Sequence, residues 1–313
     1  MFNKNSNKTL WIIFAVLLIA VVIIFSSEST KKERTFNKNI INIDTSAVTE
    51  ILLYPKSQKG KEVKLVKSKD GWKVIAENES QYTTPNAKVK NLLVQILRIK
   101  PKRLAARSKD KFAKYEVLDS VATRVVVKEG NKETLNLIIG KFAFQQPRSM
   151  STFVRPAESN DIYEVDGFLD MIFNKTANNF RDETVIKSDK NKWNRLTFEL
   201  PDETYELANT GKSWVLNGQP VDSAKTERTL NTLSRLTNTD YADIDENKLP
   251  KQNSKLTIEN DLGEPIVITA YRDSTSYIIS SSQNKENYFS GKNLGSKIYL
   301  NKDSFLPDKK QGK

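Results

Sequence analysis

The first half of the chain alternates apolar and polar positions and is interrupted by a single helical pattern. The segments in which β-branched and aromatic residues alternate with polar ones, and which therefore predict strands, are residues 50–54, 63–66, 72–75, 124–127 and 135–139. Between them, an apolar side chain recurs with the spacing of one helix face, at Val89, Leu92, Leu93, Ile96 and Leu97. Thr84 as N-cap and Pro85 at the first position begin this helix, and Pro101 ends it.

The second half repeats this order of elements, which indicates a tandem duplication. Its predicted strands are residues 196–198, 205–207, 214–216, 256–258, 266–268, 277–279 and 298–300. A helix that begins near Asp222 and Ser223 follows the strand opened by Trp214, as the first helix follows the strand opened by Trp72. We expect both tryptophans at matching core positions, with ligand stacking as the alternative.

These patterns predict an α+β fold: an N-terminal transmembrane helix followed by two tandem duplicated domains, each an antiparallel sheet packed by a helix. The ends of the two halves are matched by Ile-Tyr pairs, at residues 162–163 and 298–299. The expected divisions are a cytoplasmic tail at 1–9, a transmembrane anchor at 10–27, a linker at 28–46, a first domain at 47–186, a second domain at 187–308 and a tail at 309–313.

The anchor is predicted from residues 10–25, an apolar run without a charged side chain. At about 1.5 Å per residue, the run and its mild flanks reach roughly the 30 Å of a bilayer core. A cleavable signal peptide is the alternative, but residues 22–25 are too bulky for a small-x-small cleavage site. We therefore expect a single-pass protein of the inner membrane, with a cytoplasmic N-terminus and an extracytoplasmic, periplasmic bulk.

The amino-acid composition excludes several kinds of catalytic and metal-binding site. The chain has no cysteine and no histidine, so disulfides, thiol catalysis, the usual zinc sites and histidine-based triads are excluded. No P-loop motif occurs either, so any ATPase would be another subunit. We expect no cofactor, no metal and no catalytic residue.

The formal net charge is +12, and much of it is concentrated after the first predicted helix. The cations of this basic run are Arg98, Lys100, Lys102, Arg103, Arg107, Lys109 and Lys111, with Lys114 just beyond. Nucleic acid is not an expected partner, because the run lacks interleaved aromatic residues for base stacking. A solvated face, anionic lipid head groups, an envelope polymer or an acidic partner remain alternatives.

Two further charged segments are candidate sites. Arg181, Asp182 and Glu183 lie where the first domain leads into the second; an arginine paired with a neighbouring carboxylate would brace the joint, or would grip a carboxylate or phosphate of a ligand. An acidic cluster at residues 240–247 fails as a calcium loop, because Lys248 and Ser254 stand where glycine and glutamate are needed. The cluster is therefore expected to be a solvated loop, with a casual cation site as the alternative.

The same residues carry a resemblance to a bacterial family, domain of unknown function 4340. The matching features are Trp72, Thr84-Pro85 with the Leu-rich helix, Phe112-Ala-Lys-Tyr-Glu-Val117, Ile138-Ile-Gly-Lys141, Ser151-Thr-Phe-Val-Arg155, Ile162-Tyr-Glu-Val-Asp166 and Phe180-Arg-Asp-Glu-Thr184. Many members have Tyr-Gly-Leu where this chain has Tyr115-Glu116-Val117. The resemblance implies a membrane-anchored protein with duplicated α+β domains, encoded beside gliding-motility-type ABC transporter components.

Anchor, composition and resemblance together lead to one hypothesis and two alternatives. The hypothesis is a non-enzymatic, extracytoplasmic accessory or binding subunit of an ABC-type transport complex, with permease and ATPase subunits as partners. The first alternative is a cell-envelope scaffold that binds anionic lipid or polysaccharide through the basic run. The second is a carboxylate-dependent glycosidase, which would need two carboxylates facing each other across a cleft.

Overall fold

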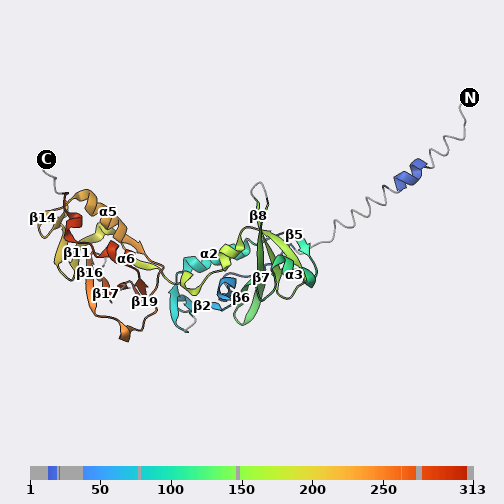
Figure 1. Ribbon diagram of the computed structural model, residues 1–313, viewed down its shortest axis with the longest axis horizontal. Coiled ribbons are helices and arrows are strands. Elements are labelled where there is room, and N and C mark those ends of the chain that lie inside the picture. The colour runs from blue at the N-terminus through green and yellow to red at the C-terminus, as the bar shows by residue number, and fades with distance from the viewer. Residues whose placement is uncertain are drawn as a thin grey trace, which may run out of the picture.

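The chain forms two sheet-based domains that lie end to end, each with its own apolar core (Figure 1). The computed structural model describes residues 13–19, 21, 38–76, 79–145, 149–261, 263–272 and 277–308. Among the described elements, antiparallel strand is the most abundant regular structure, and two helices reach 12 residues, α2 (Asn86–Leu97) and α5 (Ser223–Ser234).

The first domain is built on a nine-stranded antiparallel sheet in the order β4-β3-β2-β1-β6-β7-β8-β9-β5. Its strands are β1 (Val48–Tyr54), β2 (Val63–Ser68), β3 (Gly71–Ile75), β4 (Gln81–Thr84), β5 (Pro101–Ala106), β6 (Thr123–Glu129), β7 (Lys132–Gln145), β8 (Ser149–Pro156) and β9 (Ile162–Asp166). The alternation seen in the sequence places every second side chain inside; in β3, Trp72 and Val74 are buried and their neighbours are not.

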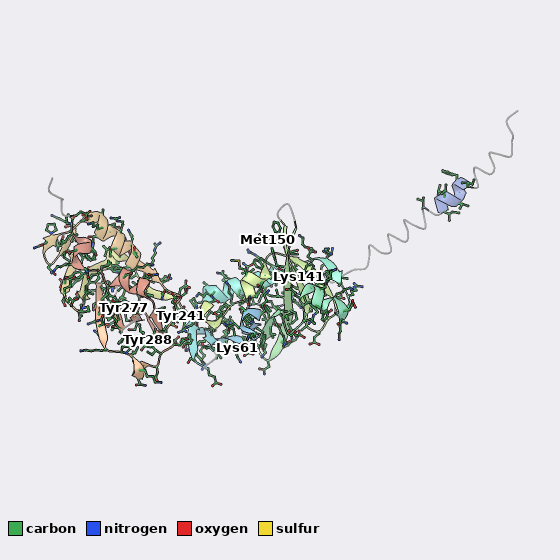
Figure 2. All side chains as sticks on the ribbon, viewed as in Figure 1. Lys61, Lys141, Met150, Tyr241, Tyr277 and Tyr288 are labelled. Carbon is green, nitrogen blue, oxygen red and sulfur yellow. The ribbon has the colours of Figure 1, made fainter. Side chains whose placement is uncertain are left out.

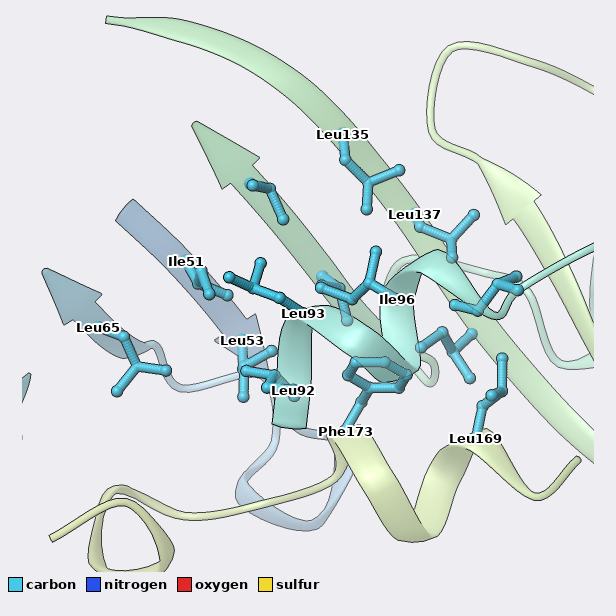
Figure 3. Close-up of a cluster of buried hydrophobic side chains, with 14 of the residues drawn as sticks. Ile51, Leu53, Leu65, Leu92, Leu93, Ile96, Leu135, Leu137, Leu169 and Phe173 are labelled. Carbon is cyan, nitrogen blue, oxygen red and sulfur yellow. The ribbon is translucent and has the colours of Figure 1, made fainter. Parts of the chain in front are cut away.

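Helix α2 covers one face of this sheet (Figure 3). Its buried residues Leu92, Leu93 and Ile96 lie against strand residues such as Ile51 and Leu65, as the helical periodicity predicts. The short helix α4 (Leu169–Phe173) adds Leu169 and Phe173 to the same core. A second, smaller core gathers around Phe112 of α3 (Phe112–Tyr115).

The second domain is built on an eight-stranded antiparallel sheet in the order β14-β13-β12-β11-β16-β17-β18-β19. Its strands are β11 (Trp193–Glu199), β12 (Thr204–Asn209), β13 (Trp214–Leu216), β14 (Gln219–Pro220), β16 (Gln252–Asn260), β17 (Ile266–Arg272), β18 (Tyr277–Ser281) and β19 (Asn284–Ser290). Helix α5 and the shorter α6 (Lys292–Ile298) contribute to its core through Leu230, Leu233, Leu294 and Ile298.

Strand order and helix position correspond between the domains, and one strand breaks the correspondence. In each domain four strands run to one edge, a 12-residue helix follows, and four further strands run to the other side. The strand after α2, β5, pairs with β9 inside its sheet. The strand after α5, β15 (Arg235–Thr237), instead pairs with β10 (Thr184–Lys187) in a separate two-stranded ribbon.

Short helical turns connect these elements. They are η1 (Lys56–Gln58), η2 (Lys109–Lys111), η3 (Ala177–Asn179), η4 (Lys190–Lys192), η5 (Glu246–Lys248) and η6 (Lys302–Phe305). Glu116 ends α3 with φ 55° and ψ 35°, the left-handed conformation that glycine adopts most easily.

The predicted fold class is wrong in its balance of elements and in its membrane helix. Antiparallel sheet dominates both domains, because the strands are many and long whereas most helices are single turns. Among the helices that the structure describes, none combines the length and the apolar character needed to cross a bilayer. Of the predicted anchor at 10–27, residues 13–19 and 21 are described and helical; the remainder, both predicted tails and residues 28–37 lie outside the described residues.

Two expectations within the second domain are also corrected. Residues 298–300 are not a strand: Ile298 ends α6, whose buried Leu294 and Ile298 lie four residues apart on one helix face. The Ile-Tyr pairs therefore do not mark equivalent positions. Trp214 lies in β13, which corresponds to β3 of Trp72 in strand order, but it is only half-buried. The fully buried tryptophan of the second core is Trp193, whose indole donates to the Ser188 hydroxyl at 3.0 Å.

Candidate functional site: the interdomain joint and cleft

The chain crosses from the first domain to the second within a few residues. Phe180 belongs to the first core, whereas Val185 and Ile186 of β10 belong to the second. Residues 181–184 are therefore flanked by Phe180, which is buried in the first core, and by Val185, which is buried in the second. This short connection places Arg181, Asp182 and Glu183 between the two sheets.

Arg181 is enclosed by groups from both domains. Its side chain is 1% exposed, and the guanidinium carbon lies 3.6 Å from the ring centre of Tyr82 on β4 and 4.0 Å from the ring centre of Tyr241. Tyr241 lies at the side of the second domain that faces the first (Figure 2). Stacking of this kind uses both faces of a weakly hydrated, planar cation.

The edge of the same guanidinium is occupied by hydrogen bonds. Nε donates to Asn287 Oδ1 at 2.7 Å, and Nη1 donates to Asp243 Oδ1 at 2.7 Å and to Asn178 Oδ1 at 3.2 Å. The carboxylate that Arg181 reaches is thus Asp243 and not the neighbouring Asp182 or Glu183. We call Arg181 and its partners Tyr82, Tyr241, Asp243 and Asn287 the Arg181 joint.

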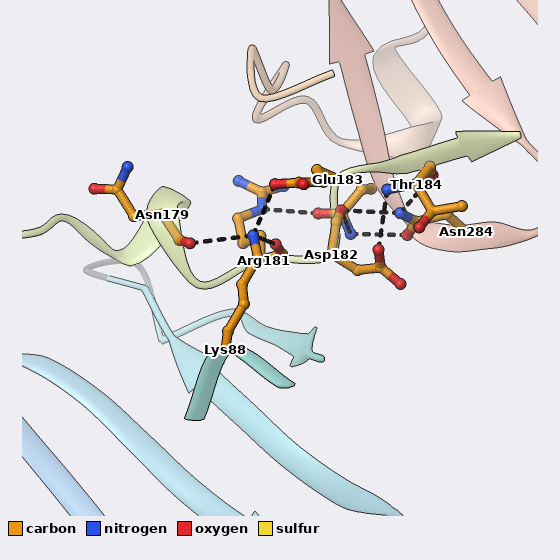
Figure 4. A network of polar contacts seen from close by, with 8 residues as sticks. Lys88, Asn179, Arg181, Asp182, Glu183, Thr184 and Asn284 are labelled. Carbon is orange, nitrogen blue, oxygen red and sulfur yellow. Dashed lines mark hydrogen bonds and ion pairs between the residues drawn. The ribbon is translucent and has the colours of Figure 1, made fainter. Parts of the chain in front are cut away.

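Asp182 and Glu183 tie the connection down by other contacts (Figure 4). The Asp182 amide donates to the Thr83 carbonyl at 3.0 Å, and the Asp182 carbonyl accepts from Asn284 at 3.0 Å, so its backbone bridges the domains. Glu183 forms an ion pair of 2.9 Å with Lys88 of α2. The Lys88 ammonium also donates to the Arg181 carbonyl at 2.8 Å.

Glu286 closes the remaining contact between strands β4 and β19. Its Oε2 accepts from the Thr83 amide at 2.6 Å, and its Oε1 lies 3.5 Å from the Lys73 ammonium. Burial would raise the pKa of Glu286, but the hydrogen bond from Thr83 and the charge of Lys73 outweigh it and hold that pKa below its ordinary value. A carboxylate therefore caps an edge strand that would otherwise present an open amide.

A cleft of about 1100 Å³ lies between the domains beside this joint. One wall is the start of α2, with Pro85, Ala87 and Lys88, and the floor is the connection from Asp182 to Asn191. The other wall is the end of α5 and strand β15, with Asn231, Ser234, Arg235 and Thr237. This is the size of a ligand pocket of the larger kind, and both domains contribute to it.

The basic run does not form one continuous positive surface. Three of its cations reach carboxylates near or on β9: Lys102 pairs with Asp166 at 2.7 Å, Arg103 with Glu164, and Arg107 with Asp161 at 3.7 Å. Lys111 pairs with Asp110 at 2.8 Å. Among the residues that the structure describes, Arg98, Lys100 and Lys109 have no ion-pair partner.

The acidic cluster at 240–247 is divided between structural roles. Asp243 belongs to the Arg181 joint, and Asp245 caps η5 by accepting from the Asn247 amide at 3.0 Å. In the described part of the chain, no group of three or more His, Cys, Asp or Glu side chains is placed to hold a metal ion.

Sequence reasoning missed several residues of the joint and of the contacts beside it. Tyr82 lies on β4, Lys88 on α2, and Glu286 and Asn287 both on β19, up to 106 residues from Arg181. Tyr82 stands two residues before the predicted N-cap, Thr84, but a lone tyrosine or asparagine in a strand has no pattern that points to an interdomain contact. Only the position of residues 181–183 at the predicted boundary gave a usable signal.

A family model matches residues 72–255, more than half of the chain, from β3 through the joint and cleft to β16. The match carries the description Domain of unknown function (DUF4340). The chain belongs to this family. The DUF4340 region thus includes the whole connection between the domains and Arg181 itself. No curated protein and no solved structure was found to match the chain.

Proposed function

We propose that this DUF4340 protein is a non-enzymatic binding subunit of an ABC-type transport complex, similar to those of gliding motility, with its two domains outside the cytoplasm. The observation that carries the proposal is the cleft between domains that the Arg181 joint fixes together. A preformed cleft with walls from two domains suits binding, because little conformational entropy is lost when the ligand arrives.

The side chains of the cleft favour binding over hydrolysis. Its acidic residues are Asp182, Glu183 and Asp189. Glu183 is paired with Lys88, and the carboxylates of Asp182 and Asp189 accept backbone N–H groups of Thr184 and Asn191 at 2.9 and 3.0 Å. A glycosidase needs one carboxylic acid and one carboxylate directed at the substrate, whereas these groups are directed at the protein.

Site-specific crosslinking in cells tests the proposal. A photoreactive residue at Asn231, an exposed position of the cleft wall, should capture a permease subunit or the transported substrate. The same residue at Lys212, exposed in the turn before β13, serves as the matched control and should capture neither. Copurification in mild detergent should recover the same subunits.

Two outcomes would replace the proposal. Recovery of envelope lipid or polysaccharide, lost when Arg98, Lys100 and Lys109 are changed to glutamate, would support the scaffold alternative. Hydrolysis of a glycan by the purified protein, abolished by one carboxylate substitution that leaves the fold intact, would support the glycosidase alternative.

A further inference from the structure

The wall of the interdomain cleft carries a pair of like charges on neighbouring strands. In the β10–β15 ribbon, Lys187 lies directly opposite Arg235, and both side chains are exposed and line the cleft. Directly opposed residues of antiparallel strands point to the same face with Cβ atoms about 4.5–5.5 Å apart, so two positive charges there destabilise the ribbon.

Elsewhere the protein places opposite charges at such positions. The other directly opposed charged pairs in the described strand registers are Glu50 and Lys128, Glu129 and Lys132, Lys128 and Glu133, Arg103 and Glu164, Arg195 and Glu259, and Glu199 and Lys255. Each combines an acid with a base. Folding stability therefore does not account for the Lys187–Arg235 pair.

The other charged side chains of the cleft are engaged by groups of the protein. Lys88 is paired with Glu183, and Lys190 with Glu227. The carboxylates of Asp182 and Asp189 accept backbone hydrogen bonds, as described above. Within the described residues, neither Lys187 nor Arg235 has a carboxylate at ion-pair distance.

Strand β10, which carries Lys187, is held against the second domain by side-chain hydrogen bonds. Gln283 holds Lys187 by accepting from its amide at 2.8 Å and donating to its carbonyl at 3.2 Å. The Ser281 hydroxyl donates to the Val185 carbonyl at 2.6 Å in the same strand. Lys187 is thus presented on a held backbone, and Arg235 lies opposite it through the pairing of β15 with β10.

We propose that the interdomain cleft binds an anionic ligand whose phosphate or carboxylate group sits between Lys187 and Arg235. The planar fork of an arginine donates two parallel hydrogen bonds to either group, and the lysine adds a point charge. Because the cleft is far larger than one ion, the rest of the ligand would lie along Pro85, Ala87, Asn191 and Asn231. The inference rests on the proposed function in taking the cleft as the binding site, but it requires no transport partner.

Calorimetric titration of the purified full-length protein tests the inference with two probes used separately, inorganic pyrophosphate and citrate. We expect at least one probe to bind. Binding of pyrophosphate would identify a phosphate ligand, and binding of citrate would identify a carboxylate ligand. Arg235→Gln and Lys187→Gln should each weaken binding about tenfold or more, the loss typical of a charge-assisted hydrogen bond. The matched controls Arg98→Gln and Lys100→Gln remove equally exposed charges outside the cleft and should leave affinity unchanged.

A charge reversal separates a binding role from a structural one. Arg235→Glu creates the opposite-charge pair found on the other strands, so it should raise the thermal midpoint by about 1–3 °C while abolishing binding. The inference is overturned if neither probe binds the unmodified protein, if the controls lose as much affinity as the cleft variants, or if Arg235→Glu lowers the midpoint and keeps binding. Failure to recover transporter subunits in cells would count against the proposed function alone.

Discussion

Arg181 contacts both domains through one side chain. Its two faces are covered by Tyr82 and Tyr241 and its edge by Asn287 and Asp243, so stacking and hydrogen bonding do not compete for the same directions. A lysine at this position would keep the charge but lose the plane and the fork. The joint therefore depends on the shape of the guanidinium as much as on its charge.

Replacing Arg181 by lysine tests this dependence. We expect Arg181→Lys to lower the free energy of unfolding by about 2–3 kcal/mol. The buried Asn287 oxygen would lose the N–H group that donates to it, and the contacts with the Tyr82 and Tyr241 rings would be lost. The control is Arg195→Lys on the exposed face of β11, where the arginine pairs with Glu206 and Glu259 and where we expect a change within about 0.5 kcal/mol. Urea unfolding of both variants measures the difference, and equal effects would contradict the proposed role of the fork.

Glu116 offers a gain in stability. Its left-handed backbone costs a residue with a Cβ atom about 1 kcal/mol, and glycine avoids this cost. We expect Glu116→Gly to raise the free energy of unfolding by about 0.5–1 kcal/mol, measured by scanning calorimetry. Glu133→Gly, at a strand position of β7 with ordinary backbone, should instead lower it by a similar amount. A loss of stability in Glu116→Gly would show that contacts of the Glu116 side chain contribute more to stability than its left-handed backbone costs.

At the scale of elements, the domains meet where two sheet edges are closed by side chains. The Thr83 amide on β4 is capped by Glu286 of β19, and Asn284 at the start of β19 holds the Asp182 carbonyl. Neither domain extends the other's sheet with a further strand at this point. The joint is therefore specific to these side chains and is sensitive to their ionisation.

Acidification should weaken this contact. Because the pKa of Glu286 is lowered in the folded protein, the unfolded chain binds more protons as the pH falls, so stability decreases on acidification. The contribution is fully present above the ordinary glutamate pKa of about 4.5 and is lost as the pH falls through the lowered folded value. Stability measured from pH 6 to pH 3 should fall less steeply in Glu286→Gln than in the unmodified protein. Identical slopes would exclude Glu286 as a contributor.

Local sequence patterns predicted the positions of helices and strands better than they predicted which strands pair and which side chains meet. Helix α2 was predictable because its apolar face lies within one window of sequence. Its details were not: the N-cap is Pro85 and not Thr84, which ends β4, and Leu97 of the predicted apolar face is exposed. The pairing of β15 with β10 was not, because both are short and their register is set by Val185, Ile186 and Leu236 entering the second core. The same holds for Arg181: its position at the boundary was visible, but Asp243 lies 62 residues away and has no local signal.

At the scale of the whole molecule, the joint should make two domains behave as one rigid body. The contacts come from three places: the Arg181 joint, the Lys88–Glu183 ion pair and the Thr83–Glu286 hydrogen bond. Because they are spread over α2, β4, the connection and β19, we expect bending between the domains to break at least one of them. A fixed cleft, on which both proposals depend, follows from this rigidity.

Spin labels in the two domains measure the rigidity directly. The chain contains no cysteine, so cysteines introduced at the exposed positions Lys132 and Lys212 are labelled without background. We expect a narrow distance distribution in the otherwise unmodified protein. Adding Arg181→Ala should broaden the distance distribution. This substitution removes the ring contacts with Tyr82 and Tyr241 and the hydrogen bonds to Asn287 and Asp243 together. Adding Arg195→Ala, which alters an exposed ion pair within one domain, should leave it narrow. A distribution already broad before Arg181 is changed would mean that the domains move independently, and the cleft would then have to form around its ligand.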